Sequence, residues 1–125
     1  MSAQARILIV DDEPDTLGLI ELTLETAGYE VSTALNAEPA MNLIQQQEFD
    51  LILLDVMMPG MSGFDMVRQL KAQMGSHPPI IFLSAKNQPE DLETGKSLGA
   101  HSFLIKPTTR GELLDAIRDV LEDTG

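Results

Sequence analysis

Short apolar or β-rich segments alternate with stretches of helical periodicity along the whole chain. The apolar or β-rich segments cover residues 6–10, 29–34, 50–56, 79–84 and 102–105. Short runs of this length and composition are typical of strands that are covered by other elements. We therefore predict five strands, and we expect the most apolar one, residues 50–56, to lie near the centre of the sheet.

A helix is predicted after each strand. Pro14 suits the first turn of a helix over 14–27, which Gly28 ends. Further helices are expected over 37–47 behind Asn36, after the capping residue Ser62, over 89–98, and at the end of the chain behind a Thr109–Glu112 capping box. The side chains predicted to point inward are Thr16, Ile20, Leu24, Ala27, Ala40, Met41, Ile44, Val67, Leu70, Met74, Leu113, Leu114, Ile117, Val120 and Leu121.

This strict alternation indicates the α/β class, with a parallel sheet and helices on both of its faces. The connections are short, and the sequence shows no repeat, linker or low-complexity tract. We therefore expect a single doubly wound (βα)5 domain over residues 1–125, with no effector domain in this chain.

Composition narrows the range of functions. Eight basic and twenty acidic residues give a formal charge of -12, which disfavours direct binding to nucleic acid. The chain has no cysteine, so disulfides and thiolate chemistry are excluded. We see no signal-peptide pattern, and the apolar runs are far shorter than the roughly 18 residues of a spanning helix. We expect a cytoplasmic protein that does not enter a membrane.

Polar side chains stand at the carboxyl ends of four predicted strands. These residues are Asp11 with Asp12, Asp55, Ser84 and Lys106. Each alone has a structural explanation, since acidic pairs cap helices and an aspartate can open a turn. In an open parallel sheet, however, these strand ends meet at one edge, where ligands bind. We therefore expect one shared site.

Three clustered carboxylates repel one another unless a cation lies among them. Oxygen ligands of this kind suit Mg²⁺, which also accepts phosphate oxygens. Ca²⁺ fits less well, because no twelve-residue ligand loop is present. Asp55 can then act as a nucleophile toward phosphorus, with the Lys106 ammonium and the Ser84 hydroxyl near the phosphate oxygens.

Four motifs make the chain resemble the receiver domain of two-component response regulators, including the stand-alone chemotaxis regulator. They are VDDEP (10–14), LLDVMMPGMSG (53–63), FLSA (82–85) and GAHSFLIKP (99–107). The resemblance covers the whole chain. It implies a flavodoxin-like sheet of strand order 2-1-3-4-5. It also implies a signalling switch rather than an enzyme, with a sensor histidine kinase or a histidine phosphotransfer domain as phosphoryl donor.

The resemblance also assigns roles to individual residues. Asp55 would carry the phosphoryl group, assisted by Lys106 and Ser84, and Lys106 would precede Pro107 through a cis peptide bond. The Mg²⁺ ligands would be Asp11 (directly or through water), Asp12, Asp55 and the backbone carbonyl of Met57. Ser84 and Phe103 would be the switch residues. They would alter the face made by the predicted fourth helix, fifth strand and fifth helix, which contacts an unknown output partner; a phosphorylation-dependent homodimer is also compatible.

A docking surface is suggested by the first helix. Gly18 and Leu22 lie opposite its predicted buried stripe, so Leu22 should be exposed. An exposed leucine is common and needs no special explanation. Because this helix flanks the acidic site, we nevertheless form the hypothesis that the kinase or phosphotransfer domain docks over Gly18, Leu22, Pro107 and Thr108.

Other interpretations remain open at this stage. A phosphatase of the haloacid-dehalogenase type uses a similar residue set, but it needs a second aspartate where this chain has Met57, and a cap domain. A pure interaction module would not need the complete set of site residues. Phe103 can also be an ordinary core aromatic. Gly95 in the predicted fourth helix indicates either a weak element of a switching face or simply low helix propensity.

Overall fold

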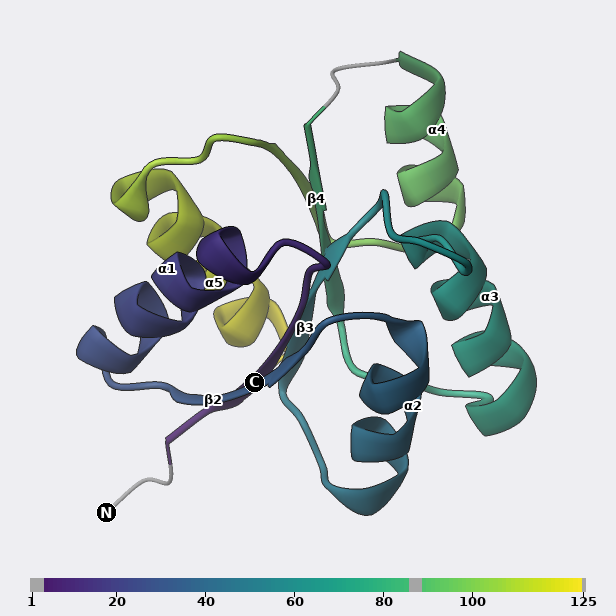
Figure 1. The fold of residues 1–125 in the computed structure, drawn as a ribbon, viewed down its shortest axis with the longest axis horizontal. Helices are drawn as coiled ribbons and strands as arrows, with labels where there is room; N and C mark the ends of the chain where they lie inside the picture. The colour runs from purple at the N-terminus through teal and green to yellow at the C-terminus, as the bar shows by residue number, and fades with distance from the viewer. Residues whose placement is uncertain (1–3, 86–88, 125) are drawn as a thin grey trace.

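The computed structural model describes residues 4–85 and 89–124, which form five strands and five helices in strict alternation (Figure 1). The strands are β1 (Arg6–Val10), β2 (Glu30–Ala34), β3 (Leu51–Asp55), β4 (Ile80–Ser84) and β5 (Ser102–Ile105). The helices are α1 (Pro14–Thr26), α2 (Ala37–Gln46), α3 (Gly63–Met74), α4 (Pro89–Ser97) and α5 (Arg110–Thr124). The predicted order of elements is confirmed.

All five strands are parallel, in the order β2-β1-β3-β4-β5, which confirms the predicted topology. Ile7 of β1 stands opposite Val31 of β2 on one side and Leu51 of β3 on the other. After β1, the chain therefore adds β2 on one side of β1 and then crosses over to add β3 on the other side. The carboxyl ends of β1 and β3 form the switch point at which such sheets bind ligands.

The helices cover the sheet as two layers, with α1 and α5 on one face and α2, α3 and α4 on the other (Figure 1). β3 and β4 are buried along their whole length, and β1 is buried except at Arg6. This agrees with their continuous apolar sequences, because a strand covered on both faces has no solvent side.

Two of the predicted inward positions are wrong. Ala27 is exposed after the last turn of α1, and Met74, the last residue of α3, is 41% exposed. Both follow the helical period but stand at a helix end, beyond the part of the helix that contacts the sheet. The buried stripe of α1 consists of Leu17, Ile20 and Leu24.

The predicted helix starts have their expected chemistry in most cases. The Ser62 hydroxyl accepts a hydrogen bond from the backbone N–H of Asp65, at 3.1 Å. Thr109 and Glu112 form a reciprocal capping box with two bonds of 3.1 Å. Asn36 stands at the start of α2 but makes no capping bond through its side chain. None of the helices in the described ranges combines the length and the apolar character that a membrane span requires.

Candidate functional site

Three carboxylates meet at the switch point of the sheet. Asp11 and Asp12 follow β1, and Asp55 is the last residue of β3. Each offers a carboxylate oxygen, and these oxygens all lie within 4.8 Å of one another. Asp11 and Asp55 are buried, whereas Asp12 is exposed, so the cluster opens to solvent on one side.

Lys106 brings a cation to this cluster from the end of β5. Its Nζ lies 2.7 Å from an Oδ atom of Asp11 and 3.4 Å from an Oδ atom of Asp55. The Lys106 side chain is 20% exposed, and the Lys106–Pro107 peptide bond is cis. The backbone N–H of Lys106 donates to the carbonyl of Ser84 at 2.7 Å, which joins the ends of β4 and β5.

Backbone hydrogen bonds orient the two buried carboxylates. The N–H of Glu13 donates to Asp11 at 3.0 Å, and the N–H of Met57 donates to Asp55 at 3.2 Å. In both cases the loop residue two positions later folds back onto the aspartate. Met57 therefore keeps its backbone next to the cluster while its side chain, 58% exposed, points to solvent.

Gly63 contributes to this arrangement, although the sequence analysis did not identify it. Its N–H donates to the carbonyl of Val56 at 2.9 Å. A Cβ added at Gly63 would overlap with the backbone carbonyl oxygen of Asp55. The absent side chain thus lets the start of α3 approach the end of β3. The only available signal was a glycine directly after the capping Ser62.

The buried position dominates the electrostatics of Asp55. Burial raises the pKa of the Asp55 carboxyl from 3.8 to about 7; Lys106 offsets part of this rise, and Asp11 adds to it. Burial alone would lower the pKa of Lys106, but its hydrogen bond with Asp11 and its attraction to Asp55 raise that pKa above 10.5. Without a further cation, the site holds more negative charge than one lysine balances.

Oxygen donors of this kind fit a hard divalent cation. Mg²⁺ commonly takes one or two carboxylates, keeps several waters and accepts phosphate oxygens. The clustered oxygens of Asp11, Asp12 and Asp55 supply such ligands, and the exposed side of the cluster leaves room for water or phosphate. The excess of negative charge at buried Asp55 is a second reason why a cation would be favoured here.

The two predicted switch residues lie on β4 and β5. Ser84 ends β4 and is buried, 1% exposed. Phe103 on β5 is half-buried, and its ring centroid lies 6.1 Å from that of Phe82. Gly95 of α4 packs against both rings: an added Cβ would lie 3.0 Å from Phe103 and 3.3 Å from Phe82. Close packing therefore explains the glycine in this helix.

The residues of the predicted docking surface are accessible. Gly18 and Leu22 on α1 are exposed, with Leu22 at 59%; Pro107 is exposed and Thr108 half-buried. Arg110 at the start of α5 donates to the carbonyl of Thr23 and to the Thr26 hydroxyl of α1. The beginning of α5 thus lies against the C-terminal half of α1.

Comparison with known proteins identifies the class. Residues 7–118 match the model of the response regulator receiver domain. The chain is 41% identical over 120 residues to the phosphate regulon transcriptional regulatory protein PhoB of Pseudomonas aeruginosa, covering 95% of this chain and 52% of PhoB.

Two solved structures are also similar. Chemotaxis protein CheY4 of Vibrio cholerae gives a TM-score of 0.89 at 37% identity, over 94% of this chain and 99% of that one. Response regulator TrrA of Thermotoga maritima, solved in complex with Mg²⁺ and BeF, gives 0.83 at 30% identity, over the same shares of the two chains.

The chain belongs to the response regulator receiver domain family. Phosphoryl acceptance from a kinase is the role of this domain in two-component signal transduction. Receiver domains interact with histidine kinases or phosphotransfer domains and with output domains. The chain spans between 17% and 53% of the length of eight curated relatives that it matches.

Proposed function

We propose that Asp55 is the residue that accepts the phosphoryl group. A carboxylate oxygen of Asp55 attacks the phosphorus of a phosphohistidine on a sensor kinase or phosphotransfer domain. The new O–P bond forms as the P–N bond breaks, and the histidine imidazole leaves. The observation that carries this proposal is the placement of the Asp55 carboxylate: it lies among Asp11, Asp12 and Lys106 at the open switch point of the sheet.

Mg²⁺ would be held by the carboxylates of Asp11, Asp12 and Asp55 and by the backbone carbonyl of Met57. When bound, it supplies positive charge for the phosphoryl oxygens. Lys106 at the end of β5 and the Ser84 hydroxyl at the end of β4 would contact the same oxygens. The complex of TrrA with Mg²⁺ and BeF supports this assignment, since that protein shares the fold and 30% of the sequence.

The phosphorylated state would be transmitted through Ser84 and Phe103. The phosphoryl group adds about -1.5 to -2 charges beside the end of β4. The Ser84 hydroxyl would hydrogen-bond a phosphoryl oxygen, and Phe103 would change its packing against α4. These two shifts would alter the α4–β5–α5 face. That face would contact an output partner or a second copy of the chain. In this account the domain assists its own phosphorylation and dephosphorylation but turns over no substrate.

The phosphoryl donor would dock over Gly18, Leu22, Pro107 and Thr108. Leu22 is an exposed apolar residue of α1, and Pro107 and Thr108 directly follow Lys106 of the acidic site. Arg110, at the start of α5, donates a hydrogen bond to the backbone of α1, so the start of α5 contacts α1. The formal charge of -12 argues against nucleic acid as a direct partner.

Beryllofluoride, a phosphoryl mimic, tests the function. We expect it to bind the wild-type chain in the presence of Mg²⁺ and not to bind Asp55→Asn, as measured by titration calorimetry. Steady turnover of a phosphate ester would instead support a phosphatase. Absence of beryllofluoride binding would support a module that is never phosphorylated, and either result would overturn the proposal.

A further inference from the structure

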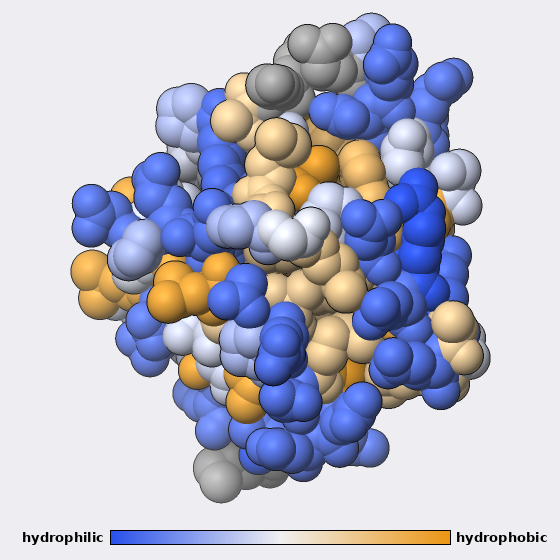
Figure 2. Space-filling model, turned by 45° about the vertical axis from the view of Figure 1, so that its right-hand side comes forward, coloured by the Kyte–Doolittle hydropathy of each residue, from blue (hydrophilic) through white to orange (hydrophobic). Residues whose placement is uncertain are grey.

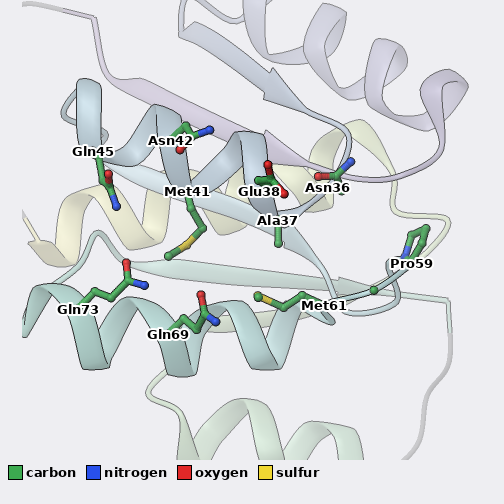
Figure 3. A pocket seen from close by; sticks show the side chains of 11 residues that line it. Asn36, Ala37, Glu38, Met41, Asn42, Gln45, Pro59, Met61, Gln69 and Gln73 are labelled. Atoms are coloured by element: carbon green, nitrogen blue, oxygen red, sulfur yellow. The ribbon is translucent and has the colours of Figure 1, made fainter.

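A groove between α2 and α3 lies outside the acidic site (Figure 3). It encloses about 440 Å³. Ala37, Met41 and Met61 form its floor, and Pro59 and Gly60 of the β3–α3 loop border one end. The face seen in Figure 2 likewise carries a band of weakly hydrophobic residues between hydrophilic borders.

The walls of this groove are rich in carboxamides. Those from the α2 side are Asn36, Asn42 and Gln45, and those from α3 are Gln69 and Gln73. The chain has ten Asn and Gln residues, of which these are five, but only one of its twenty acidic residues, Glu38, lines the groove. On a protein of charge -12, the groove is therefore a nearly uncharged, amide-lined surface.

These carboxamides are available for binding. Figure 3 shows Gln45 pointing from α2 toward α3, and Gln69 and Gln73 pointing from α3 toward α2. Within the described part of the chain, their side chains make no hydrogen bond to another residue. Each carboxamide offers a donor and an acceptor on one planar group, as a peptide unit does.

The spacing suits an extended backbone. Gln69 and Gln73 are four residues apart on α3, which corresponds to about 6 Å along the helix. Alternate peptide units of an extended chain repeat at about 6.6–6.8 Å. Successive carboxamides can therefore meet every second peptide unit. Met41 and Met61 on the floor can adapt to varied side chains because their thioethers are flexible and polarizable.

We propose that this groove binds an extended polypeptide segment of a partner protein that carries no acidic side chains. The carboxamides bind its backbone, the methionines contact its inward side chains, and the charge of the domain repels acidic segments. The inference is independent of the phosphoryl chemistry of Asp55, because none of the five carboxamides belongs to the acidic site.

A library of short linear peptides on beads tests the proposal, screened against the full chain. We expect the retained peptides to be depleted in Asp and Glu. The variant Gln45→Ala/Gln69→Ala, which removes one carboxamide from each wall, should bind them about tenfold more weakly, since two hydrogen bonds are lost. Gln46→Ala is the matched control, because Gln46 is an exposed carboxamide of α2 outside the groove, and it should bind as the wild type does.

The side-chain amide signals of the wild-type chain provide a second readout by NMR. Those of Gln69 and Gln73 should shift with a retained peptide and should not shift with a backbone N-methylated copy. The proposal is overturned if no peptide is retained, if the double variant binds equally, or if the N-methylated copy binds as well. Beryllofluoride binding by the double variant should be unchanged, which keeps this test separate from that of Asp55.

Discussion

The Nζ atom of Lys106 lies 2.7 Å from the carboxylate of Asp11, a residue 95 positions earlier in the chain. The Asp11 side chain is fully buried, and the same ammonium lies 3.4 Å from Asp55. The single positive charge of Lys106 is therefore shared by two buried carboxylates and cannot neutralise both. This excess of negative charge determines the effects of the first substitutions below.

Removing the cation should destabilise the fold. Lys106→Met leaves Asp11 and Asp55 buried without their partner, so we expect a loss of about 2–4 kcal/mol in the free energy of unfolding at neutral pH, measured by urea titration without Mg²⁺. The control is Lys96→Met, an exposed lysine of α4, which should change stability by less than about 0.5 kcal/mol. Equal effects of the two substitutions would contradict the bridging role.

The pH dependence of the Lys106 contribution has a defined sign. The pKa of Lys106 is raised above 10.5 in the folded protein. Its contribution to stability is therefore complete below that pH and is lost as the pH rises through the folded-state pKa.

Neutralising Asp55 should have the opposite effect on stability. Because the pKa of Asp55 rises from 3.8 to about 7 on folding, the folded state favours the neutral carboxyl. The contribution of Asp55 to stability therefore falls as the pH rises from about 4 to 7. We expect metal-free Asp55→Asn to be more stable than the wild type at pH 7 by about 1–3 kcal/mol, with the gain vanishing below about pH 4. Urea titrations in chelator across this range measure it, and a gain that does not depend on pH would refute the explanation.

Gly95 should resist even a methyl group. In Gly95→Ala the new Cβ would lie 3.0 Å from Phe103, so the ring or α4 must move. We expect a loss of about 1–2 kcal/mol despite the better helix propensity of alanine. The same Gly95→Ala substitution should cost less stability in a Phe103→Leu background, where the ring that the new Cβ would meet is absent. The comparison is between Gly95→Ala/Phe103→Leu and Phe103→Leu alone. Gly18→Ala is the control: nothing lies near its added Cβ, and it should gain up to about 1 kcal/mol.

A charge on α1 should impair docking of the phosphoryl donor but not the chemistry. We expect Leu22→Asp to slow phosphotransfer from a phosphohistidine protein by about tenfold or more, since an apolar contact is lost and the new carboxylate would have to be desolvated on docking. Phosphorylation by acetyl phosphate, which needs no docking surface, should be unchanged. Met74→Asp replaces an exposed apolar residue at the far end of α3 and serves as control. If both substitutions leave phosphotransfer unaltered, the donor docks elsewhere.

The sequence was sufficient for the fold because its signals were local and mutually consistent. Continuous apolar runs marked β1, β3 and β4, and alternation with helices required a parallel sheet. The errors at Ala27 and Met74 arose because helical periodicity does not say where the contact with the sheet ends.

For the site, the rule that strand ends share an edge was enough to group Asp11, Asp12, Asp55 and Lys106. It could not give the contact of Lys106 with Asp11, because distances across 95 positions depend on side-chain packing. The close approach at Gly63, and the packing of Phe103 and Phe82 on Gly95, were equally invisible. In both cases the glycine is needed because atoms from distant residues lie where its Cβ would be, and a sequence does not show which distant residues come that close.

The most direct test of the account is to locate the phosphoryl group itself. The chain is incubated with acetyl phosphate and Mg²⁺, the acyl phosphate is reduced with borohydride, and the modified position is identified by peptide mass spectrometry. We predict a single modified residue, Asp55, and no modification when Mg²⁺ is chelated. Modification at another residue, or none at all in the presence of Mg²⁺, would contradict the account.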